Sequence, residues 1–178
     1  GTFQAPYIAV AGYNPADGKQ IWEMSIGGGQ ANATPVGDEE RLYYGTGAGG
    51  GATRIGDGNL FMAYVHVAHD CTVGHHTIFG PHATLGGHVS VEDFANISAG
   101  SAVHQFCRVG RHAFIGGYSV VTKDALPFAR TIGSRPARIF GVNGIGLSRR
   151  GFTQDRIIQL KRAYRYLMQS KLNTTRAL

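Results

Sequence analysis

Residues 55–126 read IGDGNL FMAYVH VAHDCT VGHHTI FGPHAT LGGHVS VEDFAN ISAGSA VHQFCR VGRHAF IGGYSV VTKDAL when they are written in groups of six. The first residue of every group is aliphatic or Phe, and the fifth is usually small or β-branched. A period of six is typical of a parallel β-helix, in which each hexad supplies one short strand and one corner. Neither the 3.6-residue period of an α-helix nor the two-residue period of an ordinary strand fits this pattern.

The repeat divides the chain into three parts. Residues 1–54 show no sustained register, and we expect irregular N-terminal coils and a glycine-rich loop there. Residues 55–126 are the regular hexapeptide β-helix. Residues 127–178 begin at Pro127, which interrupts the repeat, and we expect an extended segment followed by one amphipathic helix from Thr153 to about Lys171. The sequence therefore predicts an all-β fold with a short C-terminal α-helical appendage.

Charge is distributed unevenly along the chain. Residues 1–128 contain 6 Lys and Arg against 10 Asp and Glu, whereas residues 129–178 contain 11 Lys and Arg and a single acidic residue, Asp155. A basic end on a slightly acidic shaft indicates an anionic partner, such as a nucleotide diphosphate or an acidic protein. Nucleic acid is not expected, because the basic segment lacks interleaved aromatic residues.

The two cysteines and the hydropathy pattern bear on the compartment. Cys71 and Cys107 are 36 residues apart, which is two coils, so they are expected roughly 10 Å apart, too far for a disulfide. We interpret them as core residues in a reducing compartment. The chain shows no apolar run long enough to span a bilayer and no signal-peptide pattern. These features predict a cytoplasmic protein without membrane insertion.

Polar side chains gather at one corner of the predicted β-helix. Residues 18 apart lie above one another, so one column contains His69, Gly87 and Gln105 and the next contains Asp70 and His88. His104 and His66 lie near the same edge, and Gly86 with Gly87 is expected to leave a gap among these side chains. Four other histidines lie outside these columns, and we expect them to be solvent-exposed corner residues: His75, His76, His82 and His112.

The His69 column suggests general-base chemistry. A histidine beside a carboxylate can accept a hydroxyl proton, with Asp70 orienting the imidazole and stabilising its charged form. Because no Ser or Cys nucleophile lies in the column, direct attack by a substrate hydroxyl is favoured over a covalent intermediate. The backbone N–H of Gly87, one level above His69, could stabilise an oxyanion.

Four segments carry a resemblance to a known family: GGGATRIGDGNLFMAYVHVAHDCTVG, ATLGGHVSVEDFA, AVHQFCRVGRHAFIGG and GLSRRGF. From about residue 45 to 172 the chain closely resembles the acyl-carrier-protein-dependent UDP-N-acetylglucosamine O-acyltransferases of lipid A biosynthesis. The resemblance implies a left-handed β-helix and a homotrimer with active sites between subunits. It also implies transfer of a 3-hydroxyacyl group from acyl carrier protein to the 3-hydroxyl of UDP-N-acetylglucosamine. No metal and no cofactor are implied, because the acyl chain arrives on the phosphopantetheine of acyl carrier protein.

The resemblance also implies roles for particular residues. His69 matches the general base, Asp70 its partner and Gly87 the oxyanion-binding backbone. Gly117 matches the position that limits the fatty-acid groove, and we expect that groove to run roughly 13 Å along the helix axis from His69. The remaining matches are substrate-pocket residues, His66, His88, His104 and Gln105, and residues near the nucleotide, Asn143, Arg149 and Arg150.

Two other functions remain open from the sequence. A zinc enzyme resembling γ-class carbonic anhydrase could take nitrogen ligands from His66, His69, His88 and His104. A degenerate scaffold could instead retain the fold and bind acyl carrier protein or nucleotide without catalysis. Residues 1–44 lack the family's loop before the glycine-rich segment, which favours the scaffold, whereas the intact His69–Asp70 pair argues for an enzyme.

Overall fold

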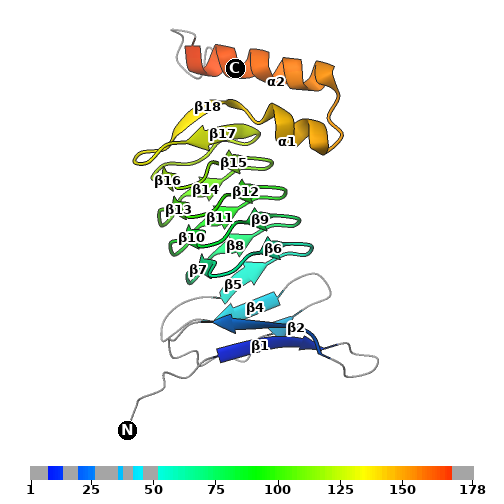
Figure 1. The fold of residues 1–178 in the computed structure, drawn as a ribbon, viewed down its shortest axis with the longest axis vertical. Helices are drawn as coiled ribbons and strands as arrows, with labels where there is room; N and C mark the ends of the chain where they lie inside the picture. Colours follow the sequence, from blue (N-terminus) through cyan, green and yellow to red (C-terminus); the bar gives the residue numbers. More distant parts are fainter. Residues whose placement is uncertain (1–7, 14–19, 27–35, 38–41, 46–51, 170–178) are drawn as a thin grey trace.

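The computed structural model describes residues 8–13, 20–26, 36–37, 42–45 and 52–169. Its centre is a stack of three-sided coils (Figure 1). Face 1 contains strands β7 (His66–Val67), β10 (Thr84–Leu85), β13 (Ala102–Val103) and β16 (Val120–Val121). Face 2 contains β5 (Ala52–Ile55), β8 (Thr72–Val73), β11 (Ser90–Val91) and β14 (Arg108–Val109). Face 3 contains β6 (Leu60–Phe61), β9 (Ile78–Phe79), β12 (Asn96–Ile97) and β15 (Phe114–Ile115).

Strand pairing follows the hexad register. Thr84 pairs in parallel with His66 below and with Ala102 above, each 18 residues away, and the other two faces repeat this spacing. Three hexads therefore make one coil, and neighbouring coils satisfy each other's backbone hydrogen bonds. The predicted parallel β-helix of hexapeptide repeats with a short helical appendage is confirmed.

The described parts of residues 1–54 differ from the irregular coils expected there. Strands β1 (Ile8–Tyr13) and β2 (Gln20–Ile26) form an antiparallel pair, and β3 (Val36–Gly37), β4 (Leu42–Gly45) and β5 pair antiparallel on face 2. Residues 1–51 lack a six-residue period, and β1 to β4 pair only antiparallel, whereas β5 also pairs in parallel with β8. Most of the expected glycine-rich loop lies outside the described residues.

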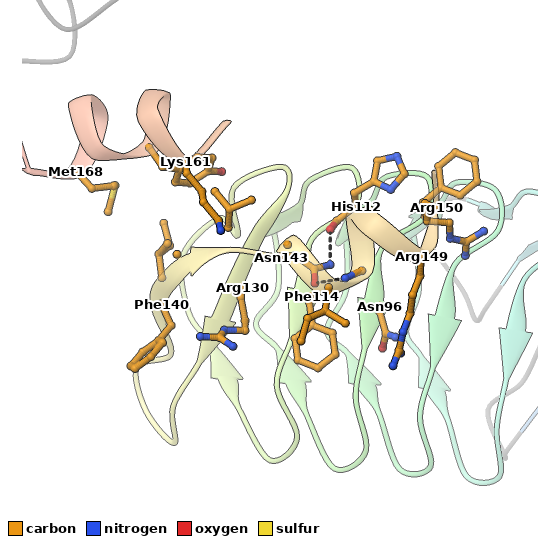
Figure 2. A pocket seen from close by; sticks show the side chains of 18 of the residues that line it. Asn96, His112, Phe114, Arg130, Phe140, Asn143, Arg149, Arg150, Lys161 and Met168 are labelled. Atoms are coloured by element: carbon orange, nitrogen blue, oxygen red, sulfur yellow. Dashed lines mark hydrogen bonds between the residues drawn. The ribbon is translucent and has the colours of Figure 1, made fainter. Parts of the chain in front are cut away.

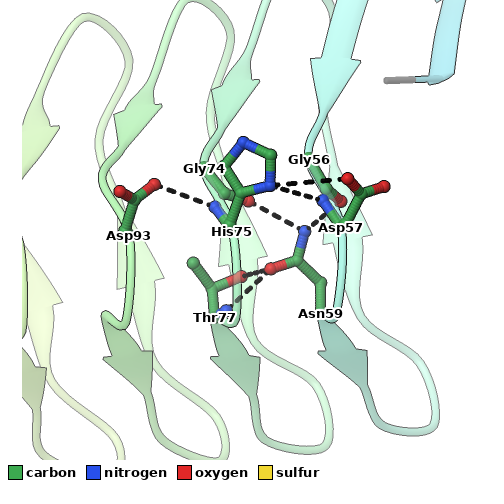
Figure 3. A network of polar contacts seen from close by, with 7 residues as sticks. All are labelled: Gly56, Asp57, Asn59, Gly74, His75, Thr77 and Asp93. Atoms are coloured by element: carbon green, nitrogen blue, oxygen red, sulfur yellow. Dashed lines mark hydrogen bonds and ion pairs between the residues drawn. The ribbon is translucent and has the colours of Figure 1, made fainter. Parts of the chain in front are cut away.

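The interior of the β-helix is filled by the first and fifth residues of the hexads. Ten first positions from Ile55 to Val121 are buried, and the remaining two, Phe61 and Val67, are half-buried near the N-terminal end. Cys71 and Cys107 occupy fifth positions as free, buried thiols, as expected, and burial raises the pKa of both. The first coil has Asn59 at its fifth position. Its side chain accepts hydrogen bonds from the amide and hydroxyl of Thr77, both at 2.7 Å (Figure 3).

The fourth residue of each hexad turns the corner. Eleven consecutive fourth positions have positive φ values between 54° and 65°, although only two of them are glycine. They stack in three columns, one at each corner. We name each corner after a residue in its column or next to it. The His69 corner joins faces 1 and 2 and contains Asp70, His88 and Phe106. The Phe94 corner joins faces 2 and 3 and contains Gly58, His76, Phe94 and His112. The Tyr118 corner joins faces 3 and 1 and contains Tyr64, His82, Gly100 and Tyr118.

A polar ladder climbs beside the Phe94 corner. The Asp57 amide donates to Nδ1 of His75 at 3.0 Å, and the His75 amide donates to Oδ1 of Asp93 at 3.0 Å (Figure 3). Arg111 continues the column with an ion pair to Asp93 at 2.7 Å. The hydrogen bond from His75, followed by the bond and charge of Arg111, lowers the pKa of Asp93.

The C-terminal part closes one end of the stack. Strand β17 (Ala129–Ile132) pairs in parallel with β15 at a spacing of 16 residues, and β18 (Arg138–Val142) then pairs antiparallel with β17. Two helices follow, α1 (Gly144–Arg149) and α2 (Gln154–Gln169), of which only the second was expected. Thr153 caps α2 as predicted, accepting from the Arg156 amide at 3.4 Å. Neither described helix is long and apolar enough to cross a membrane.

Candidate active site

His69 and Asp70 form a close pair at the His69 corner. Nδ1 of His69 lies 2.7 Å from Oδ2 of Asp70, and 51% of the His69 side chain is exposed against 16% for Asp70. When Nδ1 carries the ring proton and donates a hydrogen bond to the carboxylate, Nε2 keeps a lone pair that can accept a proton. The local backbone fixes this arrangement, because Asp70 turns the corner with a φ of 59° immediately after His69. This is the geometry of an oriented general base.

The coil above completes the cluster. Nε2 of His88 lies 3.7 Å from the same Asp70 oxygen, and the His69 and His88 rings meet edge to face with centroids 5.1 Å apart. A Cβ built on Gly87 would lie 2.6 Å from Cε1 and 2.7 Å from Nε2 of His69. The space at Gly87 is therefore occupied by the His69 imidazole rather than left as the expected gap. Any side chain there would displace the ring from the Gly87 backbone.

Three further predicted residues lie near this cluster. His66 is exposed in β7, and His104 and Gln105 are exposed immediately after β13. Nδ1 of His104 lies 3.2 Å from the Gln105 carbonyl oxygen. The 18-residue register places Gln105 two levels above His69. All three therefore lie on the same side of the β-helix as the His69–Asp70 pair.

The same cluster is a candidate for metal binding. Among the described residues, His69, Asp70 and His88 offer ligand atoms that all lie within 4.8 Å of one another. His66 and His104, which the carbonic-anhydrase alternative also names as possible ligands, are not part of that group. The zinc alternative stays a prediction.

A second site lies on face 3 beneath the C-terminal helices. It is a groove with a volume of about 1120 Å³ (Figure 2). Its lining includes apolar side chains and five cations, with no Asp or Glu among the described residues that line it. The cations are Arg130, Arg149, Arg150, Lys161 and Arg165. An apolar floor with an uncompensated positive rim suits an anionic ligand that carries a planar or apolar group.

Asn143, Arg149 and Arg150 all line this groove. Asn143 caps α1, accepting at Oδ1 from the Gly146 amide at 3.2 Å, and its Nδ2 donates to the His112 carbonyl at 3.1 Å (Figure 2). The Arg150 guanidinium lies 5.0 Å from the centre of the Phe94 ring. The expectation of an extended segment between Pro127 and Thr153 was wrong at the two arginines, since Arg149 ends α1 and Arg150 caps it. The short helix was missed because its two glycines and Ser148 are poor helix formers.

The structure distributes the predicted residues over all three corners. His69 lies between faces 1 and 2, whereas Arg150 lies against the corner between faces 2 and 3. Gly117 is exposed at the Tyr118 corner. The 48 residues between His69 and Gly117 are not a multiple of 18, so the two residues lie at different corners of one chain. The expected acyl groove between them stays a prediction.

His112 was expected to be solvent-exposed, and this was wrong. It is buried, stacked between Phe94 and Phe128 at centroid distances of 4.8 and 5.6 Å, and it meets the edge of Phe152 at 5.1 Å. Burial, followed by the charges of Arg111 and Arg150, lowers its pKa, while Asp93 opposes this shift. His76 and His82 are exposed as expected, and His75 is half-buried.

Two further residues that line the groove, Tyr164 and Met168, lie on α2. Tyr164 is half-buried and donates to the Pro127 carbonyl, and burial raises its pKa to about 12. Met168 is exposed at the rim of the groove. The aromatic fourth positions and Arg130 were not predicted to contribute to any site. The recurrence of His, Phe and Tyr at every sixth residue was the signal that could have identified the former.

Comparisons with known proteins agree with this geometry. Residues 52–87 match the family described as bacterial transferase hexapeptide (six repeats), and residues 124–178 match Udp N-acetylglucosamine O-acyltransferase, domain 2. These matches place the chain among the hexapeptide-repeat transferases. An acyl-[acyl-carrier-protein]–UDP-N-acetylglucosamine O-acyltransferase of Xylella fastidiosa is 50% identical over 123 residues, which are 69% of this chain and 47% of that protein. Its counterpart in Aliivibrio fischeri is 46% identical over 149 residues, covering 80% and 56%.

Solved structures give the same relationship. The UDP-N-acetylglucosamine acyltransferase of Francisella novicida matches with a TM-score of 0.67 and 38% identity over 69% of this chain and 45% of that one. The Arabidopsis enzyme matches with a TM-score of 0.64 and 44% identity over 68% and 42%. This chain belongs to the UDP-N-acetylglucosamine O-acyltransferase family. It spans about half the length of the curated relatives that it matches.

Proposed function

We propose that this chain transfers a 3-hydroxyacyl group from acyl carrier protein to the 3-hydroxyl of UDP-N-acetylglucosamine, the first step of lipid A biosynthesis. The observation that carries the proposal is the 2.7 Å pair of His69 Nδ1 and Asp70 Oδ2 beside the glycine backbone at residue 87. The names of the relatives supply the two substrates, and the basic groove suits the diphosphate of the nucleotide sugar.

The proposed chemistry needs no covalent enzyme intermediate. Nε2 of His69 accepts the proton of the sugar hydroxyl as that oxygen attacks the thioester carbonyl, and Asp70 stabilises the resulting imidazolium. The N–H of Gly87 stabilises the oxyanion of the tetrahedral intermediate. When the intermediate collapses, the carbon–sulfur bond breaks and the imidazolium returns its proton to the phosphopantetheine thiolate. No cofactor and no metal take part in these steps.

The placement of the residues supports a homotrimer with shared active sites. The His69–Asp70 pair lies at the corner of faces 1 and 2. The groove of Asn143, Arg149 and Arg150 lies on face 3 and reaches the Phe94 corner, so face 2 lies between the two sites. In a three-fold ring of head-to-tail contacts, each subunit presents one corner to the different corner of its neighbour. The base of one subunit would then act on a nucleotide sugar held by the groove of the next. Gly117, at the third corner, would line the acyl groove in the same assembly.

The direct test is acyl transfer to UDP-N-acetylglucosamine from a panel of 3-hydroxyacyl carrier proteins. The proposal requires turnover by the unmodified chain and its loss in His69→Ala. Binding of nucleotide sugar without turnover would favour the scaffold alternative. Dependence of the activity on tightly bound zinc, measured by metal analysis and chelation, would favour the carbonic-anhydrase alternative.

We also propose that the protein acts in the cytoplasm. Cys71 and Cys107 are free and buried, which suits a reducing compartment. The expected absence of nucleic-acid binding stays a prediction, which a salt-dependent binding assay with RNA and DNA would check.

A further inference from the structure

The Phe94 corner differs from the other two in having a continuous column of aromatic rings. His76 stacks on Phe94 at 5.3 Å, Phe94 on His112 at 4.8 Å and His112 on Phe128 at 5.6 Å, with interplanar angles between 10° and 16°. Phe152, directly after α1, packs edge-on against His112. The proposed chemistry does not use any of these rings.

This column holds Arg150 from two sides. Its guanidinium lies 5.0 Å from the centre of the Phe94 ring, and one of its terminal nitrogens is 3.5 Å from the His76 carbonyl oxygen. Arg150 is otherwise exposed on a short helix, where its long side chain would sample many rotamers. A flat aromatic surface beneath it restricts the guanidinium to a narrow range of positions over the groove.

The same column holds Asn143 through backbone groups. The Asn143 amide donates to the Phe128 carbonyl at 2.7 Å, and its side chain donates to the His112 carbonyl at 3.1 Å. Asn143 also caps the N-terminus of α1, and Arg150 caps its C-terminus. Both ends of the helix are therefore held by residues of the Phe94 corner. The rings keep those corner carbonyls in place, because each ring is packed against the next coil.

We propose that the aromatic column of the Phe94 corner is a positioning platform for the anion-binding groups of α1. Phe94 and His76 orient Arg150, and His112 and Phe128 orient Asn143. The proposal rests on the proposed function, in which these groups bind the nucleotide sugar. In this proposal the rings are positioning residues that act through Arg150 and Asn143. Phe94 and His112 also line the groove, so the test below separates positioning from direct contact with the ligand.

The test is a double-mutant cycle between Phe94→Asn and Arg150→Ala, with UDP-N-acetylglucosamine affinity measured by calorimetry alongside KM and kcat. Asn tolerates the positive φ of this position better than Phe, so the backbone is not strained by the change. Loss of a cation–π contact at an exposed site should weaken affinity about two- to fivefold and leave kcat unchanged. In the Arg150→Ala background, Phe94→Asn should cause no further loss.

Two more variants separate positioning from a general structural effect. Phe94→His should bind UDP-N-acetylglucosamine as tightly as the unmodified protein, because His76 and His112 already occupy the neighbouring levels of this column. His82→Asn is the matched control, since His82 also turns a corner with a φ of 59° and stacks on Tyr64 at 4.9 Å, away from α1. It should leave affinity unchanged, with a change in melting temperature similar to that of Phe94→Asn.

The possible outcomes separate the two proposals. If Arg150→Ala weakens affinity but Phe94→Asn does not, or if their effects simply add, the platform is refuted and the proposed function stands. If Arg150→Ala leaves nucleotide-sugar affinity unchanged, the nucleotide assignment of the groove fails, and the platform fails with it.

Discussion

The His69 corner and the Phe94 corner are built from the same six-residue unit and differ in what fills them. Both turn on fourth positions with positive φ and stack their residues 18 apart. At the His69 corner Asp70 and His88 are followed by an exposed Phe106 that stacks on His88 at 4.7 Å, and Gly87 leaves its side-chain space to the His69 ring. At the Phe94 corner four aromatic rings stack from His76 to Phe128, with Arg150 over Phe94 and Phe152 against His112. The same six-residue repeat therefore forms both the corner of the proposed base and the aromatic corner with one backbone conformation.

The largest expected effect is on kcat and comes from replacing His69, the proposed general base. His69→Ala should lower kcat about 10²- to 10⁴-fold, because it removes the imidazole that Asp70 orients as the proposed general base. Nucleotide-sugar affinity should change little, because the groove is at the other corner. Steady-state kinetics with calorimetric binding measures both quantities. A retained rate with an unchanged pH profile would show that His69 is not the base.

Loss of the groove cations should have the opposite signature. Replacing Arg149 and Arg150 together with Ala should raise the KM for the nucleotide sugar about tenfold to a hundredfold, since hydrogen bonds to charged groups are lost. Added salt should weaken binding in the unmodified protein and have less effect in the double variant. An unchanged affinity in the double variant would remove the groove from the nucleotide site.

A change at the third corner tests whether the acyl chain reaches it. A Cβ at Gly117 would meet only the Ala99 carbonyl oxygen, at an ordinary 3.5 Å, so Gly117→Met should fold normally. The larger side chain should shift preference toward shorter acyl chains by about tenfold, measured over a panel of acyl carrier proteins. Nucleotide-sugar affinity is the internal control. The same ranking of acyl lengths in both proteins would make Gly117 an ordinary corner residue.

The smallest expected effect is on stability and concerns His112. Because the pKa of His112 is lowered in the folded state, its neutral form stabilises the protein fully above the ordinary value of 6.5. This contribution is lost as the pH falls from 6.5 through the folded-state pKa. His112→Phe retains the ring and removes the titration, so its unfolding free energy should depend less on pH in that window. Denaturant titrations at several pH values measure this difference, and identical pH dependence would contradict it.

The hexapeptide repeat predicted far more of the structure than the segments outside it did. Faces, coil length and the convergence of His69, Asp70 and His88 all follow from one register, because stacking forces residues 18 apart together. That register could not reveal the packing of His112, since burial there comes from Phe152 and α1, which lie outside the repeat. Nor could it predict α1, whose glycines favour other structures and whose formation depends on contacts with the Phe94 corner. In the proposed function, the roles of residues on different corners depend in turn on an assembly of several chains.

The central claim is that a base from one subunit acts on a nucleotide sugar held by another. It is tested most directly by mixing subunits. His69→Ala and the Arg149→Ala/Arg150→Ala double variant, each nearly inactive at low nucleotide-sugar concentration, are co-expressed with different tags and purified as mixed trimers. Random one-to-one mixing should restore about a quarter of the unmodified activity, because each head-to-tail interface combines the base of one chain with the groove of its neighbour. Mixed trimers as inactive as the two pure variants would contradict a site shared between subunits.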